Sequence, residues 1–157
     1  MTAGAAAAAP RVVVLDTNIV LDVFVFADAA AAPLRAGLAD GSLDWIATAA
    51  MRVELERVLA YPQIVPRLAF YGLAAADVLS AFDRHARLVP AAPKVASTCK
   101  DPDDQGFIDL AVAHRAELLS KDRAVLCMRK RLAPWGVVVG TALGTAAVDP
   151  AVLQPPR

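Results

Sequence analysis

The sequence predicts an α/β fold built on a parallel sheet, and two observations support this class. Residues 11–15, Arg-Val-Val-Val-Leu, form an unbroken run rich in β-branched residues, which is typical of a strand buried on both faces. Residues 117–120, Glu-Leu-Leu-Ser, indicate a second short buried strand, and a helical stretch follows it at once from about Arg123. With 157 residues and 57% hydrophobic composition, the chain should form one domain with a substantial core.

Asp16 ends the first predicted strand, so its carboxylate should lie at the carboxyl end of that strand. In open α/β sheets ligands bind outside the carboxyl ends of the strands, which makes Asp16 a candidate functional residue. Asp16, Thr17 and Asn18 are also all able to cap the helix expected next. Since one cap is enough, a second role for Asp16 remains open.

Another candidate, Asp104, stands at the start of a helical stretch over 105–114. Acidic residues in a first helical turn stabilise the helix dipole without any further role. However, Asp104 precedes the apolar Phe107 by three residues, so the two should share the buried face. We therefore expect Asp104 to point toward the edge of the sheet, and its neighbour Asp103 to point elsewhere.

Asp122 follows the second predicted strand as Asp16 follows the first. Two aspartates at strand ends and one at a helix start are what a divalent-cation site requires. Mg²⁺ takes oxygen ligands, keeps several waters and usually needs only one or two direct carboxylates.

Glu54 borders the apolar stripe of a helix expected over 49–59, close to Met51 and Val58. By itself, Glu54 is more typical of a surface glutamate that pairs with Arg52 or Arg57. It becomes a candidate because it can complete the acidic group.

Four blocks of the sequence together resemble the PIN domain family. They are Val-Val-Leu-Asp-Thr-Asn-Ile-Val-Leu over 13–21, Val-Glu-Leu-Glu-Arg-Val-Leu over 53–59, Asp-Pro-Asp-Asp-Gln-Gly-Phe-Ile-Asp-Leu-Ala over 101–111 and Leu-Leu-Ser-Lys-Asp over 118–122. The resemblance extends over residues 11–139. More narrowly, the sequence is similar to the branch of toxins from bacterial toxin-antitoxin pairs, the VapC-like ribonucleases.

This resemblance implies a three-layer α/β/α sandwich with a central parallel sheet and a metal-dependent nuclease centre. The family acids fall, residue by residue, on Asp16, Glu54, Asp104 and Asp122, which are thereby implied as catalytic and metal-binding residues. Asn18 and Ser120 correspond to polar residues that orient or border the centre. The family most often has threonine at the position of Ser120, and serine keeps the hydroxyl. Asp109 replaces a residue that is usually small or apolar.

Phosphodiester cleavage is a chemistry that these residue types suit. One or two Mg²⁺ or Mn²⁺ ions can activate a water, hold the phosphate and stabilise the leaving oxygen. Acids that lie close together repel one another, and a bound cation makes the cluster tolerable near neutral pH. We expect Asp16 and Asp104 to be the most direct ligands, and Glu54 and Asp122 to be partners or water-mediated ligands.

Other chemistries have few residues to use. The histidines, His85 and His114, fall in helical stretches away from the acidic edge. Neither a glycine-rich phosphate loop nor a nucleophile elbow occurs in the sequence. Cys99 and Cys127 lack the spacing of zinc ligands, so we expect a reduced, cytoplasmic protein.

The formal net charge is zero, from sixteen basic and sixteen acidic residues. An RNA-binding enzyme therefore needs local positive potential. Residues 128–131, Met-Arg-Lys-Arg, together with Lys121 and Arg123, are candidates for the rim of the acidic pocket. The basic run is equally typical of a solvated helix face.

The expected organisation is a disordered N-terminal tail over 1–10, a nuclease domain over 11–140 and a C-terminal tail over 141–157. A helix expected over 74–88 would pack on the core or on another subunit, as in a homodimer, and a last strand is expected over 135–139. No eighteen apolar residues occur without a charge, so no membrane span is expected.

The predicted function is that of a metal-dependent endoribonuclease that hydrolyses RNA, with an antitoxin protein as partner. One alternative is a receiver-like Mg²⁺-binding phosphoacceptor domain, which also combines strand-end aspartates with a serine and a lysine, as in Ser120 and Lys121. Such a domain needs two adjacent acids after its first strand, where this chain has Asp16 alone. Another alternative is a PIN-like scaffold that binds RNA or a protein without cutting, which the presence of all four acids disfavours.

Overall fold

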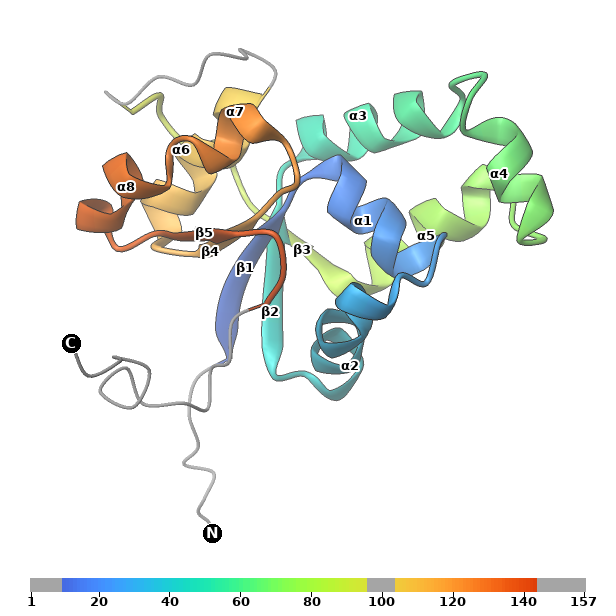
Figure 1. Ribbon diagram of the computed structural model, residues 1–157, viewed down its shortest axis with the longest axis horizontal. Helices are drawn as coiled ribbons and strands as arrows, with labels where there is room; N and C mark the ends of the chain where they lie inside the picture. Colours follow the sequence, from blue (N-terminus) through green and yellow to red (C-terminus); the bar gives the residue numbers. More distant parts are fainter. Residues whose placement is uncertain (1–9, 96–103, 144–157) are drawn as a thin grey trace, which may run out of the picture.

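A five-stranded sheet forms the centre of the computed structural model, which describes residues 10–95 and 104–143 (Figure 1). The strands are β1 (Arg11–Leu15), β2 (Leu43–Ala47), β3 (Ala86–Leu88), β4 (Glu117–Leu119) and β5 (Val138–Gly140). They lie in the order β3-β2-β1-β4-β5, and every neighbouring pair is parallel.

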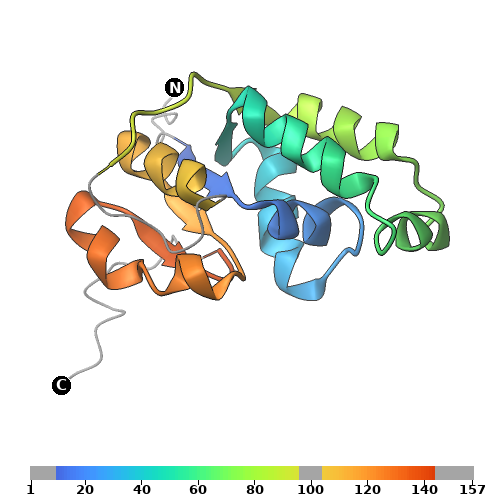
Figure 2. The ribbon, with the colours of Figure 1, turned by 90° about the horizontal axis from the view of Figure 1, so that it is seen from above.

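Helices cover both faces of this sheet. Residues of α1 (Thr17–Phe24), α2 (Ala32–Asp40), α3 (Ala49–Leu59), α4 (Val65–Phe70) and α5 (Ala75–His85) share one hydrophobic cluster. Residues of α6 (Gln105–His114), α7 (Arg123–Leu126) and α8 (Arg129–Leu132) share another. The described residues also include the short 3₁₀ helices η1 (Ala29–Ala31) and η3 (Ala133–Trp135). Seen from above, the two groups of helices lie on opposite sides of β1, which confirms the three-layer α/β/α sandwich (Figure 2).

The central strands are buried on both faces because successive side chains of a strand point to opposite sides. In β1, Val13 and Leu15 belong to one cluster, and Val14 belongs to the other. In β4, Leu118 and Leu119 divide in the same way, and both have no exposed surface. The unbroken apolar runs in the sequence therefore correctly predicted a doubly covered sheet.

The order of the strands reverses at β1, whose neighbours are β2 and β4. The connection after β1 leads toward β2 on one side, and β4 lies on the other. In open α/β sheets, such a reversal separates the loops at the carboxyl ends and leaves a crevice for ligands. The two strands meet closely here, since the amide of Asp16 donates to the carbonyl of Leu119 at 3.0 Å.

The expected helix over 74–88 is wrong in its last three residues. Helix α5 ends at His85, and residues 86–88 form the edge strand β3, whose register pairs Ala86 with Trp45 of β2. Pairing with an edge of the sheet over-rides helix propensity here. The last strand is also shifted, because Trp135 closes η3 and Gly136 turns the chain with a φ of 83° before β5 begins.

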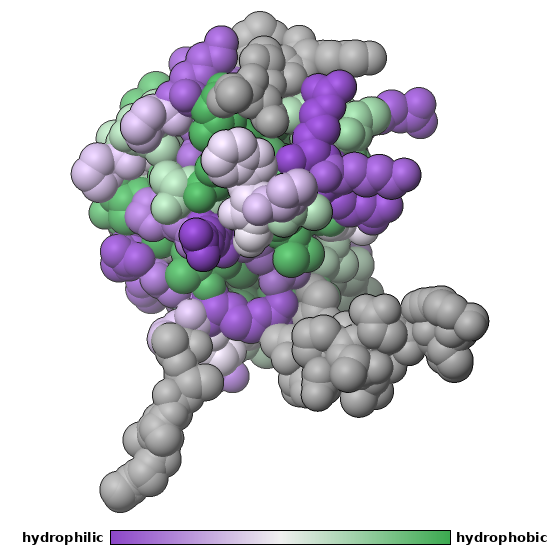
Figure 3. Space-filling model, turned by 90° about the vertical axis from the view of Figure 1, so that its left-hand side faces the viewer, coloured by the Kyte–Doolittle hydropathy of each residue, from purple (hydrophilic) through white to green (hydrophobic). Residues whose placement is uncertain are grey.

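Arg129, Lys130 and Arg131 of α8 are exposed. Helix α8 lies on the left-hand side of Figure 1, and Figure 3 shows that side of the molecule with hydrophilic side chains projecting around smaller hydrophobic patches. A contact between this run and RNA stays a prediction. No helix in the two described ranges is long and apolar enough to cross a membrane.

Candidate functional site

A cavity of about 300 Å³ lies where β1 and β4 end, and all four predicted acids line it. Its walls come from the β1–α1 junction, from α3 and the loop after it, and from the starts of α6 and α7. The lining residues are Asp16, Thr17, Asn18, Glu54, Val58, Tyr61, Gln63, Ile64, Asp104, Phe107 and Asp122. The fold thus brings together acids from four separate parts of the chain, and their chemical roles remain predictions.

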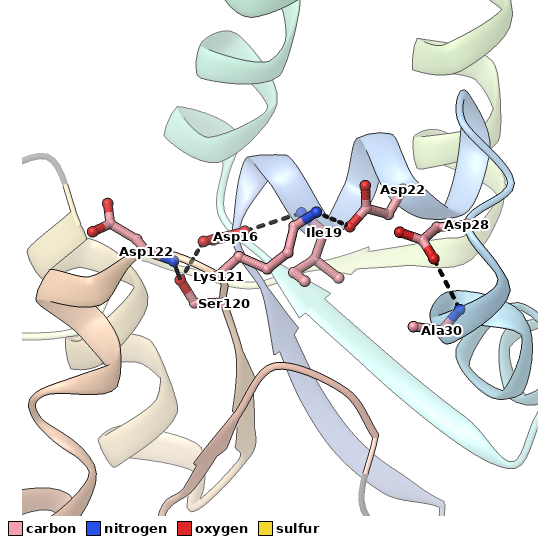
Figure 4. Close-up of polar contacts among 8 residues, drawn as sticks. All are labelled: Asp16, Ile19, Asp22, Asp28, Ala30, Ser120, Lys121 and Asp122. Carbon is pink, nitrogen blue, oxygen red and sulfur yellow. Dashed lines mark hydrogen bonds and ion pairs between the residues drawn. The ribbon is translucent and has the colours of Figure 1, made fainter.

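Asp16 is held in one orientation at the junction of β1 and α1 (Figure 4). One carboxylate oxygen, Oδ1, accepts from the amide of Ile19 at 3.0 Å, so Asp16 is the N-cap of α1. The other, Oδ2, accepts a short hydrogen bond from the hydroxyl of Ser120. Only 4% of Asp16 is exposed. Asp16 therefore caps the helix and also faces the cavity, so the two roles weighed from the sequence do not exclude each other.

Burial raises the pKa of the Asp16 carboxyl above its ordinary value, and the negative charge of Asp122 acts in the same direction. Hydrogen bonds from Ser120 and Ile19 and the positive charge of Lys121 oppose this shift without cancelling it. The ionised form of Asp16 is thus disfavoured by its surroundings. A cation in the cavity would remove this penalty.

Ser120 connects β4 to the start of α7. Its side chain is fully buried, and its Oγ accepts from the amide of Asp122 at 2.9 Å while donating to Asp16. Asp122 in turn caps α7, since its Oδ1 accepts from the amide of Ala124 at 2.8 Å. The hydroxyl of Ser120 therefore connects Asp16 to Asp122. Asp16 and Ser120 are 104 positions apart in the sequence.

Glu54 reaches the cavity from α3, whose start is capped by Thr48. Its Oε2 accepts from the hydroxyl of Thr17 at 3.1 Å. The sequence offered Arg52 as one possible partner of Glu54. In the structure Arg52 pairs with Asp83 instead, at 2.7 Å. Glu54 is consequently linked to the same β1–α1 junction that holds Asp16.

Asp104 occupies the N-cap position of α6 and is 9% exposed. Its side chain does not cap the helix, and it lines the cavity together with Phe107, as the spacing of the two residues predicted. Asp103 lies outside the described residues, so the choice between the two neighbouring aspartates stays a prediction.

Two buried acids have roles that the sequence did not reveal. Asp109 of α6 accepts from the amide of Val95 at 3.0 Å and from Nε2 of Gln105 at 2.8 Å. It therefore fastens the segment that follows β3 to the helix that carries Asp104. The second of these two acids is Asp22 of α1, which pairs with Nζ of Lys121 at 2.6 Å.

Lys121 was a candidate for the rim of the acidic pocket. Its Nζ pairs with Asp22, and the residue lines a separate hollow with Asp22, Asp28 and Ile19, while its charge still acts on Asp16. The strand-end spacing placed Lys121 near the site but could not tell which side of the sheet edge it takes.

The donor set suits a hard divalent cation, because the four acids offer oxygen ligands only. Within residues 10–95 and 104–143, no three or more His, Cys, Asp or Glu side chains are arranged to hold a metal ion by themselves. Mg²⁺ is compatible with such an open arrangement, since it usually takes one or two carboxylates and completes its shell with water. The residues present therefore fit a hydrated cation better than a closed protein cage.

These features define an α/β/α domain with an acidic cavity at the reversal point of its sheet. A family model described as PIN domain matches residues 12–124, so the chain belongs to the PIN domain family. PIN domains are generally nucleases and typically use divalent metal ions, and membership therefore supports a hydrolase. No curated protein matched the chain in a comparison of sequences.

Proposed function

We propose that this protein is a metal-dependent endoribonuclease that hydrolyses RNA phosphodiester bonds and acts as the toxin of a toxin-antitoxin pair. The observation that carries the proposal is the convergence of Asp16, Glu54, Asp104 and Asp122 on one cavity of a PIN domain. Acids at the carboxyl edge of a parallel sheet occupy the place where such folds bind ligands.

In this proposal Asp16 and Asp104 would hold Mg²⁺ or Mn²⁺ directly, and Glu54 and Asp122 would act through water. When bound, the cation supplies charge neutralisation at the phosphate and a more acidic water. Ser120 and Ile19 fix the direction of the Asp16 carboxylate by their hydrogen bonds. Buried carboxylates already oriented in this way lose little freedom when a cation binds.

The rest of the cavity suits a nucleotide. Val58, Ile64 and Phe107 provide apolar wall, and Gln63 provides an amide that can bond to a base or a phosphate. Tyr61 lines the same cavity and is 37% exposed, so its ring is accessible to an unstacked base. Single-stranded RNA is commonly recognised by such stacking on aromatic side chains.

The receiver-like alternative loses support from the topology. Receiver domains have the strand order 2-1-3-4-5, whereas this sheet has the order β3-β2-β1-β4-β5. The scaffold alternative keeps the fold and the cavity but requires no cation, and it is separated from the nuclease by experiment.

The test is cleavage of mixed single-stranded RNA with Mn²⁺ or Mg²⁺, with and without EDTA. We expect metal-dependent cleavage that Asp16→Asn abolishes. Glu56 of α3 is exposed and does not line the cavity, so Glu56→Gln is a matched control for Glu54→Gln and should stay active. RNA binding without cleavage, equal in the wild type and in Asp16→Asn, would support the scaffold and contradict the nuclease.

The toxin role is tested in cells. Induced expression of the chain should arrest growth, Asp16→Asn should not, and coexpression of a small protein encoded beside the gene should restore growth. Growth unaffected by an active, well-expressed enzyme would remove the toxin role and leave the ribonuclease proposal standing. Size-exclusion chromatography of the purified chain tests the expected homodimer.

A further inference from the structure

Side-chain contacts hold three consecutive residues of the turn between β4 and α7, namely Ser120, Lys121 and Asp122. The contacts of Ser120 and Asp122 lie beside the acidic cavity, and the contact of Lys121 does not. Ser120 bonds to Asp16, and the amide of Asp122 bonds back to Ser120. The residue between them, Lys121, reaches in the opposite direction and pairs with Asp22. Figure 4 shows Lys121 extended from the turn to the side of α1.

The carboxylate of the Lys121–Asp22 pair is more enclosed than the carboxylates of the surface pairs Arg52–Asp83 and Arg87–Asp44. The side chain of Asp22 is 10% exposed and that of Lys121 is 46% exposed, with 2.6 Å between Nζ and Oδ2. By contrast, the pair of Arg87 and Asp44 has side chains that are 57% and 25% exposed. A largely buried carboxylate needs a partner, so Asp22 holds the Lys121 ammonium in place.

The Lys121–Asp22 pair connects the two elements that position Asp16 and Asp122. Asp22 is part of α1, the helix that Asp16 caps, and Lys121 directly precedes Asp122, which caps α7. A link between α1 and the β4–α7 turn therefore fixes the separation of the two acids. Ser120 provides the same link from the other side of the turn.

We propose that Lys121 and Asp22 are positioning residues that hold Asp122 beside Asp16, so that the two carboxylates can share one divalent cation. The inference rests on the proposed function only in requiring that a cation bind at this cavity. Neither residue lines the acidic cavity.

Electrostatics and positioning make opposite predictions for a variant of Lys121. Lys121→Met keeps the length of the apolar stem and removes the positive charge. Loss of a positive charge beside an acidic cavity should strengthen cation binding if charge alone matters. Loss of the tether should weaken it, because outer partners of metal ligands typically contribute 10-fold to 100-fold to metal affinity.

The experiment is a titration of the metal-free protein with Mn²⁺ by isothermal calorimetry, with the thermal midpoint measured alongside. We expect Lys121→Met to bind Mn²⁺ about 10-fold more weakly than the wild type. Lys121→Arg keeps the ion pair and should bind within about 2-fold. Arg87→Met breaks a pair between β3 and β2 whose residues do not line the cavity, and this variant should bind Mn²⁺ like the wild type.

The double variant Asp22→Asn/Lys121→Met separates positioning from stability. It leaves no unpaired buried charge, so its thermal midpoint should recover relative to Lys121→Met, while its Mn²⁺ affinity should stay low. Affinity that recovers together with the thermal midpoint would show that the pair acts on stability alone. Equal or tighter Mn²⁺ binding by Lys121→Met would also overturn the inference.

Binding is measured without RNA, so the result does not depend on catalysis. A wild type that binds Mn²⁺ and cuts no RNA contradicts the proposed nuclease, and the variants then still test the positioning pair. A wild type that binds no Mn²⁺ contradicts both.

Discussion

Replacing Asp16 by asparagine should stabilise the metal-free protein at neutral pH while removing its activity. Asp16 is 4% exposed, and burial together with the charge of Asp122 raises its pKa. The ionised carboxylate therefore costs free energy in the folded state. Asparagine removes that charge, and it caps helices about as well as aspartate, so α1 keeps its N-cap.

The sign and size of the effect follow from proton linkage. A carboxyl whose pKa is raised on folding stabilises the protein fully below its unfolded pKa, and this contribution is lost as the pH rises through its folded pKa. Each unit of separation between the two pKa values corresponds to about 1.4 kcal/mol. For a chain of this size, about 1 kcal/mol changes the melting temperature by about 2–4 °C.

The assay is thermal unfolding of both proteins in EDTA between pH 4 and pH 8. The melting temperature of the wild type should fall relative to that of Asp16→Asn as the pH rises, so that the variant is the more stable at pH 7. Added Mn²⁺ should raise the melting temperature of the wild type only. A variant that is less stable at pH 7, with a difference independent of pH, would refute the reasoning about the buried charge.

Three further substitutions test separate parts of the account. Glu54→Gln should reduce RNA cleavage by about 10-fold to 100-fold, whereas the exposed Glu56→Gln should not, and equal rates would remove Glu54 from the site. Ser120→Ala leaves Asp16 and a buried amide without their hydroxyl partner, so it should lower the free energy of unfolding by about 1–3 kcal/mol; an unchanged denaturant midpoint would contradict this. Phe82→Ala should lower it by about 3–5 kcal/mol, because the ring is 2% exposed and packs edge-on against the tryptophan of β2 at 5.0 Å between centroids; a loss below about 1 kcal/mol in the same unfolding assay would show that the cluster is loosely packed.

The central part of the fold was predictable because it depends on local pattern. The unbroken apolar runs at β1 and β4 predict burial on both faces, and both strands lie in the middle of the sheet. The edge strand β3 was not predictable, because Ala86 continues the helix pattern of α5 without a breaking residue. Only its pairing with β2 makes that segment extended. The domain limits at residues 10 and 140 remain predictions.

The acidic site was predictable to the extent that strand ends meet at one edge of a parallel sheet. Asp16 and Asp122 follow from this rule, and Asp104 follows from its spacing to Phe107. The contacts of Asp109 and Lys121 do not, because their partners are fixed by tertiary structure. Val95 is 14 positions away from Asp109, and no sequence spacing indicates that its amide will face that carboxylate.

The central claim is that acids from four parts of the chain surround one divalent cation. The most direct measurement is an anomalous difference map from crystals soaked in Mn²⁺. The account predicts a peak in the cavity within coordination distance of Asp16 and Asp104, with Glu54 and Asp122 bound directly or through water. A fully soaked crystal with no peak in this cavity, or with Mn²⁺ bound only elsewhere, would contradict it.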